Sequence, residues 1–141
     1  MKTGKFTESD KCTAGNAACL SFASYSGVRD TGDYWVLIEV NEASMGGRPK
    51  SDGPDTIEEL MRNTRNNPLE DLGMHLPVIC DRYEIRDDVF PGAGEFRGGM
   101  GVVKSQRFLV PGFMTHESDR NEDVPWGIFG GGEGVTAAVR M

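Results

Sequence analysis

The sequence lacks the features that would place it among nucleic-acid-binding or membrane proteins. Lys and Arg number 15 against 22 Asp and Glu, for a formal net charge of -7, and no basic stripe is present. A phosphate-binding surface needs clustered cations, so this composition argues against a nucleic-acid partner. No run of about 18 apolar residues occurs and no apolar stretch follows the first residues, so we expect neither a membrane span nor a secretory signal. We therefore expect a cytoplasmic protein with a single domain, residues 1–141.

Motifs for nucleotide binding, nucleophilic catalysis and zinc binding are also missing. The glycine-rich stretch 92–99 precedes a predicted strand instead of a helix and has no Gly-Lys-Ser/Thr, which favours a turn over a phosphate loop. No Gly-x-Ser-x-Gly elbow occurs. Cys12, Cys19 and Cys80 lack paired zinc spacing, so we expect reduced thiols, with a Cys12–Cys19 disulfide as the alternative.

Two histidines, His75 and His116, leave several roles open. Each could serve as a general base, a metal ligand or an ordinary hydrogen-bonded surface histidine. Residue chemistry favours the last of these roles for both.

Large core-forming side chains are scarce, whereas glycine is abundant. Ile, Leu, Val and Phe make up about a fifth of the chain, and 19 residues are Gly, against a usual glycine share of about 7%. Glycine loses more backbone entropy on folding than other residues. We expect a marginally stable or oligomeric chain in which Trp35, Phe113 and Trp126 contribute to apolar surface facing a partner.

Hydrophobic patterning predicts an α+β fold, mostly β, with one amphipathic helix at about 55–66. The helix would begin at Asp55 as N-cap and end before Pro68, with apolar residues at i, i+3, i+4 and i+7 from Ile57. Residues 1–33 show only weak patterning. Predicted strands are residues 34–40, 78–86, 102–110 and 113–117, the last two as a hairpin across Pro111-Gly112.

The densest set of hydrogen-bonding side chains is Asn63-Thr64-Arg65-Asn66-Asn67 at the end of the predicted helix. Asparagine amides donate and accept, which suits amides and imides, and arginine binds carboxylates with two parallel hydrogen bonds. The alternative is a helix C-terminus in which Arg65 meets the dipole and the asparagines satisfy the last carbonyls.

Several segments in order resemble the hydantoinase B/oxoprolinase family. The segments that carry the resemblance are 41–49, Asp52-Gly53, Asn63 to Glu70, Leu76-Pro77 with Arg82 to Arg86, Gly92 to Gly101, Ser118-Asp119-Arg120 and Pro125 to Gly131. The resemblance implies part of the B-type subunit of an ATP-dependent hydrolase that opens cyclic amides, similar to 5-oxoprolinase or N-methylhydantoinase. The implied partner is a separate A-type subunit that uses ATP to activate the substrate carbonyl.

The resemblance covers only the C-terminal part of such a subunit. It implies that ATP and a divalent metal belong to the A-type partner or to the N-terminal part of the B-type subunit, so we expect no cofactor in this chain and assign no metal ligand or catalytic residue. That N-terminal part and the A-type subunit would be its partners in a hetero-oligomer. The alternatives are a piece of a ketone carboxylase subunit of the acetone or acetophenone type, a non-catalytic assembly module, or an inactive fragment.

The resemblance and the residue chemistry together select a substrate-binding surface. Glycines at 46 and 47 allow close backbone approach, and Arg48 and Arg65 would hold an acidic group of a small-molecule substrate. The predicted set is Gly46, Gly47, Arg48, Asn63, Arg65, Asn66 and Asn67.

Overall fold

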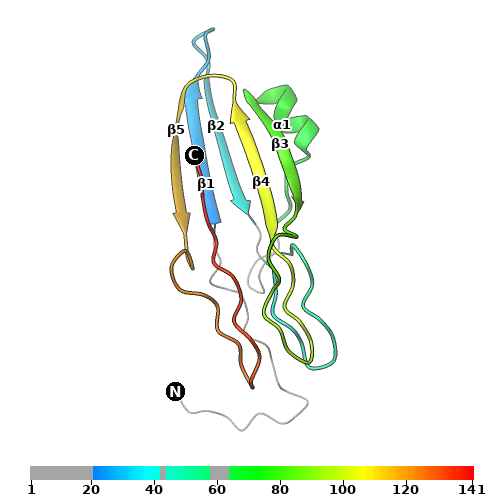
Figure 1. The fold of residues 1–141 in the computed structure, drawn as a ribbon. Helices are drawn as coiled ribbons and strands as arrows, with labels where there is room; N and C mark the ends of the chain where they lie inside the picture. The colour runs from blue at the N-terminus through cyan, green and yellow to red at the C-terminus, as the bar shows by residue number, and fades with distance from the viewer. Residues whose placement is uncertain (1–20, 42–43, 58–63) are drawn as a thin grey trace.

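A computed structural model describes residues 21–41, 44–57 and 64–141. Two antiparallel sheets account for the regular structure, with strands in the order β2-β1-β5 in one and β3-β4 in the other (Figure 1). The elements are β1 (Ser21–Val28), β2 (Tyr34–Asn41), α1 (Leu69–His75), β3 (Val78–Ile85), β4 (Val102–Phe108) and β5 (Gly112–Ser118). Strands thus predominate over a single short helix within the described residues, as expected for an α+β fold.

Strand β2 shows the alternation that the sequence predicts. Trp35, Leu37 and Glu39 are buried, whereas Tyr34, Val36 and Ile38 between them are exposed. Because successive side chains of a strand point to opposite faces, one face of β2 packs inward and the other faces outward.

The inward faces of the two sheets meet through aromatic rings. The Phe108 ring lies 4.8 Å from that of Tyr25 and 6.1 Å from that of Trp35, measured between centroids. These residues join strands of both sheets, so they place the core between the sheets. The buried apolar residues of the described chain are Ala23, Tyr25, Trp35, Leu37, Leu72 and Val78.

A buried ion pair also connects the two sheets. Lys104 Nζ lies 2.7 Å from Glu39 Oε1, and Gln106 Nε2 donates to Glu39 Oε2 at 2.6 Å. The Lys104 and Glu39 side chains are only 8% and 7% exposed. Burial, and secondly the charge of Glu39, raise the pKa of Tyr25 on the neighbouring strand.

The four predicted strands are confirmed, but the pairing of the last two is wrong. β4 pairs with β3, and β5 pairs with β1, so residues 109–111 cross from one sheet to the other instead of closing a hairpin. Strand β1, which the sequence does not predict, forms the centre of the larger sheet. It reaches β2 through a turn in which Arg29 N donates to Asp33 O at 2.8 Å.

The predicted helix bounds are also wrong. Asp55, Thr56 and Ile57 are not helical, Thr56 has a φ of 45°, and residues 64–66 are not helical either, while 58–63 lie outside the described residues. The described helix is α1, which begins after the end of the predicted helix. Pro68 precedes it, Glu70 and Asp71 occupy its first turn, and Leu72 is its buried residue.

The strands occupy one half of the molecule, and irregular loops occupy the other (Figure 1). We call these halves the strand end and the loop end. The loop end contains residues 44–57, 91–101 and 119–134 (Figure 1). Within the described part of the chain, no helix has the length and apolar character needed to cross a membrane.

Candidate functional site

Two glycine-containing loops, residues 44–57 and 91–101, lie against each other at the loop end. Their backbones are joined directly, without an intervening strand. Three N–H groups donate across the contact: Gly53 to Arg97 O at 2.8 Å, Gly99 to Met45 O at 2.7 Å and Thr56 to Met100 O at 2.8 Å. These bonds fix two segments that are more than forty residues apart in the sequence.

Glycine is required where the two loops touch. A Cβ atom on Gly99 would lie 2.0 Å from Pro54 O, and one on Gly53 would lie 2.7 Å from Gly99 N of the second loop and 2.1 Å from Met45 O of its own loop. A Cβ on Gly47 would lie 2.2 Å from Phe96 O. No side chain fits at such distances, so the glycines allow the two backbones to approach closely.

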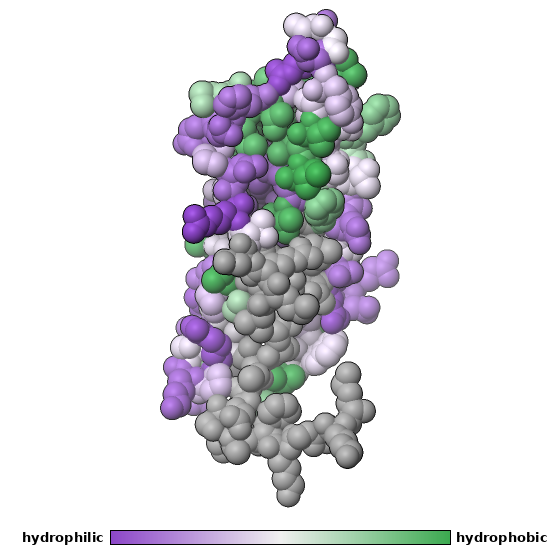
Figure 2. Space-filling view, turned by 180° about the vertical axis from the view of Figure 1, so that it is seen from behind, coloured by the Kyte–Doolittle hydropathy of each residue, from purple (hydrophilic) through white to green (hydrophobic). Residues whose placement is uncertain are grey.

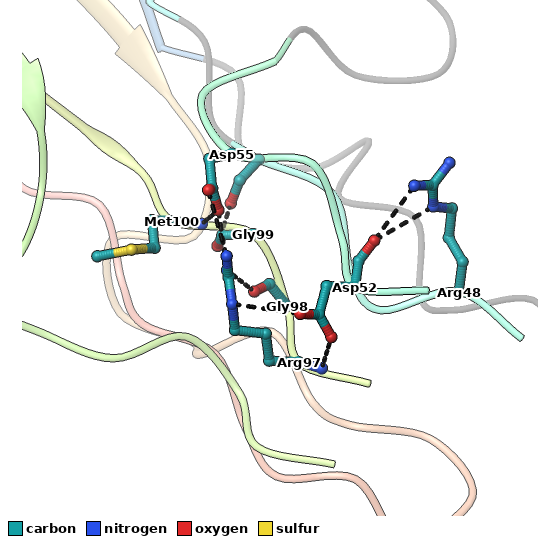
Figure 3. Close-up of polar contacts among 8 residues, drawn as sticks. Arg48, Asp52, Asp55, Arg97, Gly98, Gly99 and Met100 are labelled. Carbon is teal, nitrogen blue, oxygen red and sulfur yellow. Dashed lines mark hydrogen bonds and ion pairs between the residues drawn. The ribbon is translucent and has the colours of Figure 1, made fainter. Parts of the chain in front are cut away.

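Arg97 connects the two loops through carboxylates of the first (Figure 3). Its Nη1 donates to Asp55 Oδ1 at 2.8 Å and its Nη2 to Asp55 Oδ2 at 3.2 Å, the bidentate geometry that suits a guanidinium. Asp52 accepts the backbone N–H of Arg97 at 2.9 Å. Asp55 also accepts the backbone N–H of Met100 at 2.7 Å. We call these four residues the Arg97 latch.

The electrostatics of the Arg97 latch favour its charged state. The hydrogen bond from Arg97, and secondly that from Met100, lower the pKa of Asp55. The same pair raises the pKa of Arg97. Asp55 is therefore occupied by a basic side chain and a backbone amide, which explains why it does not act as the N-cap of a helix.

A third segment closes onto these loops. Gly132 N donates to Ala93 O at 2.6 Å, and Gly134 N donates to Pro125 O at 2.7 Å. The Arg120 guanidinium lies over the Trp126 ring, 4.8 Å from its centroid. The loop end thus brings together three glycine-containing segments that carry the resemblance found in the sequence.

The first group of predicted site residues lies in the loop 44–57. Gly46 and Gly47 are partly buried there, and Gly47 contacts the second loop. Arg48 is exposed, and its Nε and Nη2 both donate to Asp52 O at 3.3 Å (Figure 3). The structure therefore brings Gly46, Gly47 and Arg48 beside the Arg97 latch.

The second group lies in the segment that precedes α1. Arg65, Asn66 and Asn67 are exposed, and the Asn66 side-chain amide donates to the Tyr83 hydroxyl on β3. Asn63 lies outside the described residues. The two groups are thus on separate segments, and the helix C-terminus proposed as the alternative role for Arg65 is not formed at that residue.

Sequence reasoning missed the Arg97 latch as a unit. It assigned Asp55 to a helix cap and Arg97 to an isolated turn. The sequence contains one signal: an arginine stands among the glycines of 92–101, and two carboxylates, Asp52 and Asp55, stand in a second glycine-containing stretch. Opposite charges in two loops of this kind indicate that the loops pair.

The remaining candidates lie on other elements than the two loops of the latch. His75 accompanies Asp71 at the end of α1, with Nδ1 3.1 Å from an Asp71 carboxylate oxygen. His116 on β5 lines a shallow hollow together with Asn121 and residues 137–139. Cys80 is a free thiol. Cys12 and Cys19 lie outside the described residues, among which no group of three or more His, Cys, Asp and Glu could hold a metal ion.

Two of the three aromatic residues expected to face a partner are exposed. Phe113 is 82% exposed and Trp126 is 58% exposed. The expectation is wrong for Trp35, which is only 4% exposed because it packs beside Phe108 between the sheets.

Comparison with known proteins identifies the group to which this chain is related. A model of the hydantoinase B/oxoprolinase family matches residues 4–140. The putative B-type subunit of a D-/L-hydantoinase from Pseudomonas sp. (strain NS671) is 38% identical over 128 residues, which make up 90% of this chain and 21% of that protein. The 5-oxoprolinase PfmaA of Pestalotiopsis fici is 30% identical over 129 residues, which make up 88% of this chain and 10% of that protein. The 5-oxoprolinase of Dictyostelium discoideum is 33% identical over 86 residues, or 61% of this chain and 7% of that protein.

The chain spans about a fifth or less of the length of these relatives. The family match nevertheless covers nearly all of the chain, including the three segments that meet at the loop end. This chain belongs to the hydantoinase B/oxoprolinase family.

Proposed function

We propose that the chain is part of the B-type subunit of an ATP-dependent cyclic-amide hydrolase and acts with a separate A-type subunit that uses ATP. The observation that carries this proposal is the family match over residues 4–140, together with 38% identity to a protein named as the B-type subunit of a hydantoinase. Relatives named as 5-oxoprolinases also support a cyclic amide as the substrate class. The chain would form the C-terminal part of the B-type polypeptide.

The charges at the loop end decide which arginines are available to a substrate. Arg97 donates to both oxygens of Asp55, so its guanidinium is occupied within the fold. Arg48 and Arg65 are exposed, and the Nε and Nη2 of Arg48 donate at 3.3 Å to a neutral carbonyl oxygen, that of Asp52, instead of a carboxylate. In the proposed site, these two side chains hold acidic groups of the substrate or of its activated form, because a guanidinium binds such groups with two parallel hydrogen bonds.

The asparagines have a separate role in this proposal. Asn63, Asn66 and Asn67 would donate to and accept from the amide that is opened, because a side-chain amide matches both its N–H and its C=O. Gly46 and Gly47 would let the backbone approach the ligand without a Cβ in between. ATP, when bound by the A-type subunit, would supply the activation of the carbonyl, and a divalent metal would belong to that subunit or to the N-terminal part of the B-type subunit.

The experiment is reconstitution of the complete assembly from this chain, the rest of a B-type subunit and an A-type subunit. Ring opening of 5-oxoproline, hydantoin and N-methylhydantoin is measured with and without ATP, and each mixture is repeated without this chain. We expect ATP-dependent ring opening of at least one of these compounds that disappears when the chain is omitted.

Two results would contradict the proposal. Carboxylation of acetone or acetophenone without ring opening would assign the chain to a ketone carboxylase. Ring opening that continues at the same rate without this chain would assign it a non-catalytic role.

A further inference from the structure

Strand β2 is apolar on both of its faces. Trp35 and Leu37 on the inner face are 4% and 3% exposed, whereas Tyr34, Val36 and Ile38 on the outer face are 69%, 44% and 54% exposed. Strands whose two faces are both apolar are typical of sheets that are covered on both sides. The described residues cover only one side of this sheet.

The neighbouring strands also carry exposed apolar side chains on this face, with Ser24 and Ser26 of β1 between them. Val36 pairs with Ser26 and Ser26 with Phe113, so the exposed Phe113 ring lies in the same row as Val36, across the width of the sheet. Val28, 55% exposed, pairs with Tyr34 in the next row of β1 and β2. We call this surface the outer face, formed by Phe22, Ser24, Ser26, Val28, Tyr34, Val36, Ile38, Val40, Phe113, Thr115 and Glu117.

The outer face carries little charge, although the chain as a whole is acidic. Glu117 is the one charged residue among those that form it, while the chain has a net charge of -7. Seen from behind, the molecule also gathers apolar residues in the half that contains the strands (Figure 2). A surface on which large apolar side chains gather among small hydroxyl side chains, with a single charge, is typical of a contact with another protein.

The comparisons show how much further polypeptide the relatives carry. The match to the Pseudomonas protein extends over 90% of this chain but only 21% of that protein, and the match to PfmaA over 88% and 10%. Relatives therefore carry several times more polypeptide outside the matched segment than within it. An uncharged protein surface supplied by that polypeptide fits an outer face with a single carboxylate at its rim.

We infer that the outer face of the β2-β1-β5 sheet docks the part of the hydantoinase B polypeptide that relatives carry outside the matched segment. The inference rests on the proposed function for the identity of this partner. The outer face belongs to the strand end, whereas the Arg97 latch and Arg48 belong to the loop end, the other half of the molecule (Figure 1). The chain would thus bind the rest of the B-type polypeptide through its sheet, and its loop end would face the substrate.

A binding experiment tests the outer face separately from catalysis. The partner is the Pseudomonas hydantoinase relative with its matched segment deleted, and its affinity for this full chain is measured. Ile38→Glu places a charge among the exposed apolar residues of β2 on the outer face, whereas Ile85→Glu places the same charge on β3, where Ile85 is 48% exposed outside that face. We expect Ile38→Glu to weaken binding by about tenfold or more and Ile85→Glu to leave it unchanged, with both variants folded by circular dichroism.

Other occupants of the outer face would overturn the inference. One contradicting result is a dimer of the free chain that Ile38→Glu converts to a monomer, because a second copy would then cover the face. Another is protection of Tyr34 and Ile38 from hydroxyl-radical labelling in the free chain that disappears when residues 1–20 are removed. Absence of binding, or equal binding by both variants, would also contradict it. If binding follows the expected pattern but the reconstituted assembly opens no ring, the outer face is established as a docking surface and the proposed function is refuted instead.

Discussion

The strand end and the loop end are both connected by an ion pair between distant segments, but the two pairs differ in burial. Lys104 and Glu39 are 8% and 7% exposed between the sheets, whereas Arg97 and Asp55 are 40% and 32% exposed between the loops. A buried carboxylate has lost its water and depends on its partners, while a half-exposed one retains solvent. An ion pair therefore has a large effect on the free energy of unfolding at the strand end and a small effect at the loop end.

The loop end, whose ion pair is half-exposed, is held together by backbone contacts. Gly53 and Gly99 each donate a backbone hydrogen bond to the opposite loop, and neither position has room for a Cβ atom. The strand end depends on side chains between sheets, and the loop end depends on close approach of main chains. This difference predicts which substitutions each end tolerates.

Loss of the buried cation should have the largest effect. Lys104→Met leaves the Glu39 carboxylate buried without its cation, which costs about 3–5 kcal/mol of unfolding free energy. For a chain of this size the melting temperature should fall by roughly 10 °C. Urea and thermal unfolding of the full chain measure both quantities.

Two control variants isolate the effect of burial. Glu39→Gln in the Lys104→Met background removes the buried charge and retains an acceptor for Gln106, so it should recover a large part of the lost stability. Arg107→Met breaks an exposed pair with Asp81, whose side chains are 61% and 41% exposed, and should shift the melting temperature by a few degrees at most. Equal changes in melting temperature for Lys104→Met and Arg107→Met would contradict the view that burial decides how much an ion pair stabilises the fold.

A methyl group at the loop crossing should have the second largest effect. Gly99→Ala would place Cβ 2.0 Å from Pro54 O, so one of the two backbones must move, at a cost of about 1–3 kcal/mol. Gly101→Ala is the matched control, since its Cβ would meet nothing within 4 Å. Urea unfolding of both variants measures the difference, and equal stability would show that the loops are not held in close contact.

The sequence predicts the strand end better than the loop end. The sequence predicts β2, β3, β4 and β5 because each contains a short run of β-branched and aromatic residues, which are typical of strands. The sequence does not predict β1, because its inward residues are Ala23, Tyr25 and Gly27, and two of these are too small to produce a hydrophobic signal. Gly27 suits its position because the Trp35 side chain of β2 lies against it, so that a Cβ atom there would be 2.8 Å from Trp35 Nε1.

The site depends on contacts that no local pattern encodes. The Arg97 latch joins residues more than forty positions apart, and the helix signal at Asp55 is overridden when that carboxylate accepts hydrogen bonds from Arg97 and Met100. Pairing of β5 with β1 likewise requires a choice between sheets that the Pro111-Gly112 turn signal does not contain. Sequence reasoning therefore identifies the loops and leaves their assembly open.

The half-exposed latch should produce a smaller, pH-dependent effect. Asp55→Asn removes the ion pair with Arg97, and we expect the melting temperature near neutral pH to fall by only a few degrees, because solvent screens the pair. The folded pKa of Asp55 lies below its unfolded value of about 3.9, so its contribution is present above that value and is lost as the pH falls through the folded pKa. The difference between wild type and Asp55→Asn should therefore shrink below about pH 4. A difference that stays constant from neutral pH down to pH 2 would contradict the role of the charge.

The smallest expected effect on stability belongs to Arg65→Lys. Arg65 is exposed and lies outside any helix, so the free chain should unfold within about 0.5 kcal/mol of wild type in urea. In the reconstituted assembly the same substitution should lower ring-opening turnover, because lysine cannot reproduce the two parallel hydrogen bonds of a guanidinium. Arg140→Lys, at another exposed arginine outside the proposed site, serves as the matched control and should leave turnover unchanged. Turnover of Arg65→Lys equal to that of Arg140→Lys, with unchanged stability, would remove Arg65 from the site and leave Arg48 beside the Arg97 latch as its remaining cation.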